Sequence, residues 1–212
     1  MSKIYPEILD SKRRKVFYNL KNISNKAVLI GGTALALQIK HRKSIDFDLI
    51  FDKPIEKNLL HAVNLTFKEH QILPEIDSPN ELTVKLDENI KITYFHYPYP
   101  NLHPLIKTEH INLYSLYDLA SNKAHTVGRR GEWKDYVDLY FLLEKERLNI
   151  GQIIKETEKR FHGEFNDKLF WEQLVYWDDI KDFEIEFIGK PIPKEEIQEY
   201  FKKLTKNHLS KI

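Results

Sequence analysis

Residues 31–49 read GGTALALQIKHRKSIDFDL, and this stretch decides the fold of the chain. Its glycine pair follows the apolar run 27–30, which is predicted to be a buried strand. Residues 33–40 are predicted to form a helix with Thr33 near its N-cap. Backbone N–H groups are free where a glycine turn opens a helix, and phosphate binds such groups. The pattern therefore predicts a strand, a phosphate-binding turn and a helix.

Two aspartates follow on a second apolar run, residues 45–51, which is predicted to be a strand. Because Asp46 and Asp48 stand two positions apart, their side chains would share one face, while Ile45 and its alternate neighbours would be buried on the other. Paired carboxylates repel each other unless a cation lies between them, and hard oxygen ligands suit Mg²⁺ or Mn²⁺. We expect Asp46 and Asp48 to be catalytic metal ligands. The alternative is that both are surface residues of an edge strand.

The remaining pattern predicts helix, strand, helix, strand, helix and then three strands up to residue 97. This order corresponds to an α+β core with a mixed β-sheet covered on one side. The run Pro98-Tyr99-Pro100-Asn101-Leu102-His103-Pro104 breaks the pattern, and everything after it is predicted to be helical. We therefore expect a core over residues 1–104 and a helical domain over residues 105–212.

The glycine turn with the two aspartates resembles the nucleotidyltransferase superfamily that shares the polymerase-β-like fold. Within that superfamily it is most similar to the AbiEii-type toxins of bacterial toxin–antitoxin and abortive-infection systems. A second block of the sequence resembles an element that this family carries after its core: Lys123, Arg129-Arg130 and Lys134-Asp135-x-x-Asp138-Leu139. The resemblance implies a nucleotidyltransferase core, 1–104, and a C-terminal helical domain, 105–212, that completes the nucleotide cleft.

Five residues of the first block are candidate phosphate-binding residues: Gly31, Gly32, Thr33, Arg42 and Ser44. The glycines would let the backbone approach the phosphates, the hydroxyls would donate hydrogen bonds and the guanidinium would neutralise charge. Each has a structural alternative. The glycines would serve a tight turn, Thr33 would be an N-cap, and Arg42 and Ser44 would lie in an exposed loop.

In the second block, the resemblance implies that Lys123 is catalytic and reaches the triphosphate of a bound NTP. Arg129, Arg130 and Lys134 are further candidate nucleotide-binding residues. Asp138 borders an apolar run, so it would lie in the nucleotide pocket or bond to Lys123. The alternative is an ion pair with Lys134, four positions earlier on one helix.

Active members of the superfamily generally carry a third carboxylate on a neighbouring strand. The corresponding strand here, residues 90–95, has no acid, and Thr93 occupies the expected position. Glu81, Asp87 and Glu88 are nearby but are predicted to be loop residues. The missing acid favours an alternative function, a catalytically weak or inactive relative that binds a nucleotide or a partner.

Aromatic residues gather where the last predicted strand ends. Tyr94, Tyr97 and Tyr99, together with Pro98 and Pro100, would offer a stacking surface for a base or RNA. The alternative is that these side chains belong to the core.

Composition limits the other possibilities. The 212 residues have a net charge of +1, so any basic surface for nucleic acid must be local. There is no cysteine, which agrees with a cytoplasmic location, and neither a signal region nor a membrane span is evident. We expect an enzyme that moves an NMP from an NTP to an acceptor, either RNA such as tRNA or a protein, with a cognate antitoxin as partner.

Overall fold

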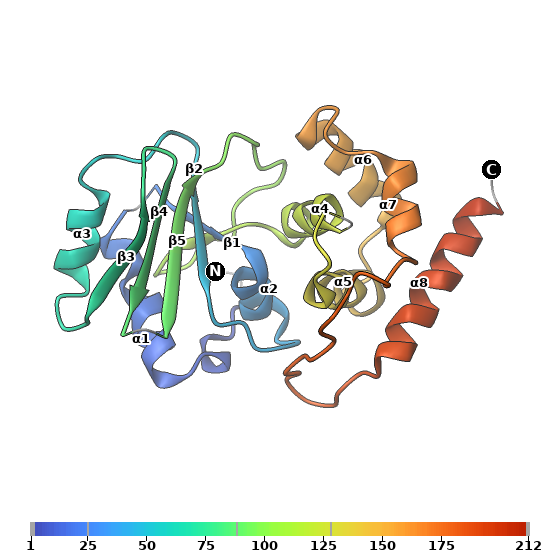
Figure 1. Cartoon of the computed structure of the whole chain (residues 1–212), viewed down its shortest axis with the longest axis horizontal. Coiled ribbons are helices and arrows are strands. Elements are labelled where there is room, and N and C mark those ends of the chain that lie inside the picture. Colours follow the sequence, from blue (N-terminus) through green and yellow to red (C-terminus); the bar gives the residue numbers. More distant parts are fainter. Residues whose placement is uncertain (1–2, 25, 88, 128, 211–212) are drawn as a thin grey trace. The chain divides into compact units, whose positions relative to one another are not determined.

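A computed structural model describes residues 3–24, 26–87, 89–127 and 129–210 (Figure 1). The chain forms two compact units, Met1–Ser115 and Leu116–Ile212, called here the N-terminal and C-terminal units. The division follows Ser115 rather than Pro104, because a short strand, β6 (Asn112–Leu113), adds to the sheet of the N-terminal unit. The expectation that everything beyond Pro104 is helical was therefore wrong for this segment. Glu88, one of the candidate acids, lies outside the described residues.

The N-terminal unit is built on a six-stranded sheet with the order β3-β4-β5-β2-β1-β6. The other strands are β1 (Val28–Ile30), β2 (Phe47–Phe51), β3 (Ile72–Asp77), β4 (Glu81–Leu86) and β5 (Ile90–His96). The pairs β2–β5 and β1–β6 are parallel, and the other neighbours are antiparallel. The predicted α+β core with a mixed sheet is confirmed.

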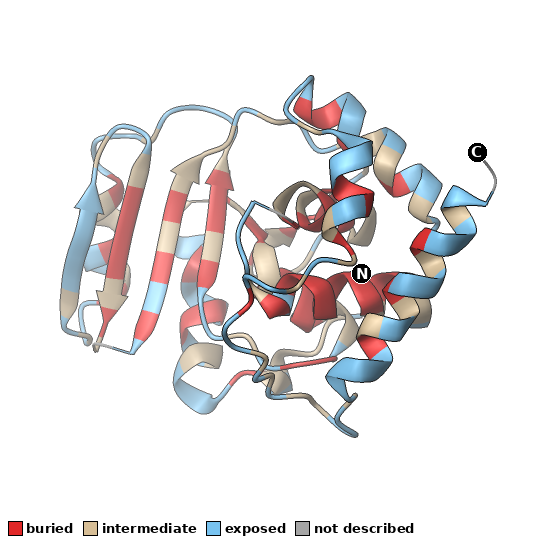
Figure 2. Ribbon diagram, turned by 45° about the vertical axis from the view of Figure 1, so that its right-hand side comes forward, coloured by how far each residue is buried: buried red, intermediate tan, exposed pale blue. Residues whose placement is uncertain are grey.

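Residues alternate between the two faces of the central strands. On one face the apolar side chains are fully buried, as with Leu49, Val84 and Ile92. The opposite face carries polar side chains such as Asp48 together with apolar ones such as Ile50. Figure 2 shows the change in burial from residue to residue along the strands. Three α-helices belong to this unit: α1 (Ser11–Asn19), α2 (Gly31–Ile39) and α3 (Leu59–Thr66). The amide of Arg13 donates to Asp10, which caps α1.

The C-terminal unit is built from helices, as predicted. These are α4 (Leu116–Thr126), α5 (Trp133–Tyr140), α6 (Ile150–Phe161), α7 (Asp167–Gln173) and α8 (Lys194–Leu209). Helix α5 continues into a π-helical turn, Phe141–Lys145, and is buried along almost its whole length. It packs against both α4 and α8, so it forms the core of this unit. Throughout the described ranges, every helix is too short or too polar to cross a membrane.

Candidate active site

The carboxylate of one of the two aspartates lies against the glycine turn. Helix α2 begins at Gly31, directly after β1, and Gly31 has a φ of +73°. Because Ile30 pairs with Asp48 across β1 and β2, the Asp48 carboxylate lies against this turn. A Cβ on Gly31 would stand only 2.6 Å from Asp48 Oδ2. Glycine is therefore favoured here by the backbone conformation and by the close approach of a carboxylate.

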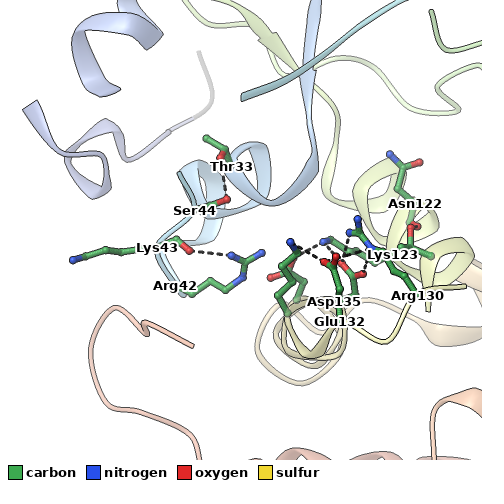
Figure 3. A network of polar contacts seen from close by, with 12 residues as sticks. Thr33, Arg42, Lys43, Ser44, Asn122, Lys123, Arg130, Glu132 and Asp135 are labelled. Carbon is green, nitrogen blue, oxygen red and sulfur yellow. Dashed lines mark hydrogen bonds and ion pairs between the residues drawn. The ribbon is translucent and has the colours of Figure 1, made fainter. Parts of the chain in front are cut away.

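The second glycine accommodates a buried cation. A Cβ on Gly32 would lie 2.6 Å from Arg42 Nη2 and 3.0 Å from Ser44 Oγ. Arg42 is buried, and its Nη1 donates to the backbone carbonyl of Lys43 at 2.9 Å (Figure 3). The N-cap residue of α2 is Ile30, which has no polar side chain to cap the first turn. Backbone N–H groups and a guanidinium thus meet at one helix N-terminus, and both attract an anion.

Thr33 joins the helix to the loop that precedes β2. Its buried hydroxyl donates to the backbone carbonyl of Asp46. The same hydroxyl lies 2.9 Å from Ser44 Oγ (Figure 3). The expectation that Thr33 lies near the N-cap was wrong, because α2 starts two residues earlier at Gly31. Thr33 instead fixes the position of the backbone that carries Asp46.

The two aspartates occupy the start of β2, as the motif suggested, but only one is in the strand. Asp48 is half-buried within β2, whereas Asp46 is exposed and immediately precedes it. Phe47 and Leu49 are fully buried on the opposite face, as predicted. Ile45 was expected to join them, but it is 53% exposed because strand pairing begins after it.

The donor set of this pair fits a magnesium ion. Within the described ranges, no group of three or more His, Cys, Asp or Glu side chains could hold a metal. The candidate site therefore consists of two carboxylates. Protein-bound Mg²⁺ commonly uses one or two carboxylates and completes its shell with water and substrate phosphate. Asp46 and Asp48 are the residues that would hold it.

A row of polar side chains extends from Asp48 across the sheet. Asp48 lies opposite Thr93 on β5, and Thr93 lies opposite Thr83 on β4. The Thr83 hydroxyl donates to Glu81 Oε1 at 2.8 Å and lies 3.5 Å from Thr93 Oγ1. Glu81 was predicted to be a loop residue, and this was wrong, because it is the first residue of β4. Because alternate and directly paired residues share a face, Glu81 lies on the same side of the sheet as Asp48.

Sequence reasoning missed this placement of Glu81, although the signal was present. Glu81, Thr83 and Lys85 alternate with Leu82, Val84 and Leu86, and that period of two extends the strand back to residue 81.

Asp87, in contrast, has a structural role. It lies 2.7 Å from His70 Nδ1 and accepts a hydrogen bond from the Gln71 amide. The hydrogen bond with His70 holds the pKa of Asp87 below its ordinary value.

Lys123 is held by two buried carboxylates in the C-terminal unit. Its Nζ lies 2.6 Å from Asp135 Oδ1 and 2.7 Å from Asp138 Oδ2. All three side chains are buried, and they join α4 to α5. Arg130 donates to both oxygens of Asp135, at 2.9 and 3.2 Å (Figure 3).

The cations of this cluster keep Asp135 ionised. Burial alone would raise the pKa of Asp135, but the charge of Lys123 and the hydrogen bonds from Arg130 outweigh it, so the pKa lies below its ordinary value. The cluster is therefore a set of matched opposite charges in a buried position.

The other basic candidates of the second block have partners outside this cluster. Lys134 Nζ lies 2.7 Å from Glu132, so it does not form the predicted alternative pair with Asp138. Arg129 donates to the backbone carbonyl of Glu164. Of the second block, the structure thus brings together Lys123, Arg130, Asp135 and Asp138.

Comparison with known proteins identifies the family of this chain. Residues 18–210 match the family described as nucleotidyl transferase AbiEii toxin of type IV toxin–antitoxin systems. The match spans most of the chain, and the chain belongs to this family. It is a nucleotidyltransferase by that membership, which confirms the resemblance that the two sequence blocks indicated.

Two kinds of relative extend the comparison. An uncharacterized protein of Aquifex aeolicus (strain VF5) is 28% identical over 191 residues, which cover 88% of this chain and 90% of that protein. The crystal structure of JHP933 from Helicobacter pylori has a TM-score of 0.56 at 20% identity and covers 98% of this chain and 95% of its own. A second H. pylori crystal structure has the same TM-score and identity, with coverage of 94% and 93%. At this identity the structures show a shared fold.

Proposed function

We propose that the chain transfers a nucleoside monophosphate from an NTP to an acceptor hydroxyl in a reaction that depends on Mg²⁺ or Mn²⁺. The acceptor is RNA such as tRNA, or a protein, and the chain acts in the cytoplasm as a toxin with a cognate antitoxin. One observation carries the proposal: the Asp48 carboxylate lies against the glycine turn that opens α2, with exposed Asp46 two residues away.

Asp46 and Asp48 are the proposed metal ligands. A divalent cation held there supplies charge that neutralises the triphosphate and lowers the pKa of the attacking hydroxyl. Thr33 supports this arrangement because its hydroxyl fixes the Asp46 backbone. Gly31 supports it because the missing Cβ leaves the Asp48 carboxylate beside the turn.

The first turn of α2 is the proposed triphosphate site. Its N-cap residue, Ile30, has no polar side chain, and the Arg42 guanidinium lies beside Gly32 in this turn. Gly32 and Ser44 complete the set. The candidates of the second block, namely Lys123, Arg129, Arg130, Lys134 and Asp138, belong to the proposal through the family motif that they form.

The chemistry is an exchange of one P–O bond for another. The acceptor oxygen forms a bond to the α-phosphorus, while the bond from that phosphorus to the oxygen bridging to the β-phosphate breaks. Pyrophosphate leaves with the electron pair. The hydroxyl proton passes to water.

The alternative function, a weak or inactive relative that binds a nucleotide or partner, is favoured by one observation. Thr93, which directly faces Asp48, is not an acid. Both functions allow metal-dependent NTP binding, but only the first releases pyrophosphate.

The test compares Asp46→Asn and Asp48→Asn with Asp77→Asn, an exposed aspartate on β3. The chain is incubated with each labelled NTP, Mg²⁺ and total RNA, and bound nucleotide, pyrophosphate and labelled RNA or protein are measured. We expect the first two variants to lose most metal-dependent NTP binding and all transfer, and Asp77→Asn to match the wild type. Unchanged NTP affinity in both site variants would contradict the assignment of Asp46 and Asp48 as metal ligands.

A further inference from the structure

A cavity lies in the N-terminal unit on the same sheet face as Asp48. Its volume is about 410 Å³, a size typical of small-molecule sites. Val28 and Ile50, which are paired across β1 and β2, form part of its lining. Ile50 follows Asp48 by two residues on one face of the strand, so the two side chains stand about 7 Å apart. A ligand in this cavity would therefore lie within one nucleotide's reach of Asp48.

Aromatic rings form another part of the lining. Tyr97 and Tyr99 follow β5, and their ring centroids lie 5.1 Å apart with the planes inclined at 69°. Phe95 continues the series, with its ring 5.8 Å from that of Tyr97. Rings that border an open cavity offer faces and edges to a planar ligand. Nucleobases are such ligands, and stacking on aromatic side chains is how proteins commonly bind unpaired bases.

The polar groups of the lining have mixed charge. Lys26 and Lys53 are both exposed, and Lys26 pairs with Glu56 at 3.0 Å. Asp52 lies beside Lys53 in the same lining. A carboxylate disfavours a simple anion such as inorganic phosphate. It favours a ligand that carries hydroxyl or amino donors as well as negative charge, and a ribonucleotide has a 2′-hydroxyl, a base and a phosphate.

We propose that this cavity holds one unpaired nucleotide of an RNA acceptor. The base contacts Tyr97 and Tyr99, the adjacent phosphate contacts Lys53, and the RNA continues along the sheet face toward Asp48. This proposal rests on the proposed nucleotidyl transfer and identifies the class of acceptor: a single-stranded RNA end rather than a protein.

The experiment measures binding of a short, fluorescein-labelled single-stranded RNA to the full chain by anisotropy, in EDTA and without NTP. Tyr97→Ala and Tyr99→Ala are compared with Tyr176→Ala, an exposed tyrosine of the C-terminal unit. We expect each cavity variant to weaken binding roughly 5- to 150-fold, the range for loss of one stacked base, while Tyr176→Ala has no effect. Tyr97→Phe keeps the ring, so it should keep the affinity. Circular dichroism and thermal unfolding confirm that each variant is folded.

Lys53→Ala tests the phosphate contact separately. Losing one phosphate contact on single-stranded RNA lowers the slope of log affinity against log salt by about 0.7. The matched control is Lys68→Ala, an exposed lysine that is not part of the cavity lining. The slope should be unchanged in that control.

Wild-type affinity in both Tyr97→Ala and Tyr99→Ala would overturn the proposal. The proposal would also be overturned if the wild type bound an unfolded polypeptide in a Tyr97-dependent manner and did not bind the RNA. The acceptor would then be a protein. The assay needs no metal, NTP or transfer. Tyrosine-dependent RNA binding by a chain that never releases pyrophosphate would therefore refute the proposed function and leave the RNA site standing.

Discussion

Asp48 on β2 lies directly opposite Thr93 on β5 in their parallel pairing, so the two side chains share one sheet face. The resemblance to the nucleotidyltransferase superfamily predicted an acid at the position of Thr93. In this chain a hydroxyl stands there, and it cannot act as a base near neutral pH. The nearest carboxylate along the same polar row is Glu81, which is bonded to Thr83 one strand further on.

Thr93→Asp should strengthen the site. The new carboxylate would face Asp48, add an oxygen ligand and be available as a base, which is typically worth ~10²–10⁴-fold in rate. We expect tighter Mg²⁺ binding by calorimetry and faster pyrophosphate release at saturating Mg²⁺. Thr83→Asp is the matched control, because Thr83 faces Thr93 and not Asp48. Equal gains in both variants, or none in Thr93→Asp, would contradict the assignment.

Gly31→Ala should damage the site more than its backbone strain alone explains. The new Cβ would lie 2.6 Å from Asp48 Oδ2, so the carboxylate or the turn must move. Gly163 provides the control, since its φ of +76° nearly equals the +73° of Gly31 but nothing lies within 4 Å of its missing Cβ. Both variants should lose about 1–2 kcal/mol of unfolding free energy from strain. Only Gly31→Ala should also lose metal-dependent NTP binding, measured by titration; equal NTP affinity in the two variants would refute the contact.

Local sequence patterns predicted most of the helices and strands. They failed where an element exists, or begins, because of contacts with residues distant in the sequence. The period of two in β5 and the glycine pair before α2 were sufficient for strand, turn and helix. Strand β6 has only two residues and exists because it pairs with β1, more than eighty positions earlier, so no periodic signal marks it. The start of α2 at Gly31 likewise depends on a positive φ and on a close approach of Asp48, which comes from another strand.

The candidate site shows the same division. The i, i+2 spacing of Asp46 and Asp48 was visible in the sequence, but the start of β2 between them was not. The i, i+4 spacing on one helix favoured an ion pair between Lys134 and Asp138. In the structure Asp138 instead pairs with Lys123 of another helix, and Lys134 pairs with Glu132. Burial explains the difference, because a buried carboxylate needs a buried cation more than an exposed one does.

Lys123→Ala should destabilise the C-terminal unit strongly. Two buried carboxylates, Asp135 and Asp138, would lose their shared ammonium, and breaking a buried ion pair typically costs ~3–5 kcal/mol. Lys134→Ala removes a half-exposed lysine and should cost less than ~1 kcal/mol. Urea unfolding followed by tryptophan fluorescence measures this, because Trp133, Trp171 and Trp177 all belong to the C-terminal unit.

A double variant separates the ion cluster from other effects of the truncation. Lys123→Met with Asp138→Asn removes a positive and a negative charge together, so it should recover part of the lost stability. If Lys123→Ala cost no more than Lys134→Ala, the cluster would have no structural role.

The free energy of unfolding of the C-terminal unit should fall at acidic pH because of His125. Its ring stacks on Phe161 with centroids 3.8 Å apart, and its side chain is 15% exposed. Burial, followed by the positive charges of Arg129 and Arg160, lowers its pKa from 6.5 to about 4, and Glu164 opposes this only in part. Between these two values the unfolded chain binds a proton that the folded chain does not. The contribution of His125 is therefore complete above pH 6.5 and is lost as the pH falls toward 4.

The measurement is the urea unfolding free energy by tryptophan fluorescence at about pH 7.5, 5.5 and 4.5. We expect the wild type to lose about 1–3 kcal/mol over this range through His125, in addition to the loss from its carboxylates. His125→Phe keeps a ring against Phe161 and removes the titrating group, so its curve should be flatter by that amount. His162→Asn is the control: His162 is exposed with a φ of 28°, a conformation that asparagine tolerates. Because His125 is buried beside Arg129 and Arg160, parallel curves for the wild type and His125→Phe would refute the linkage.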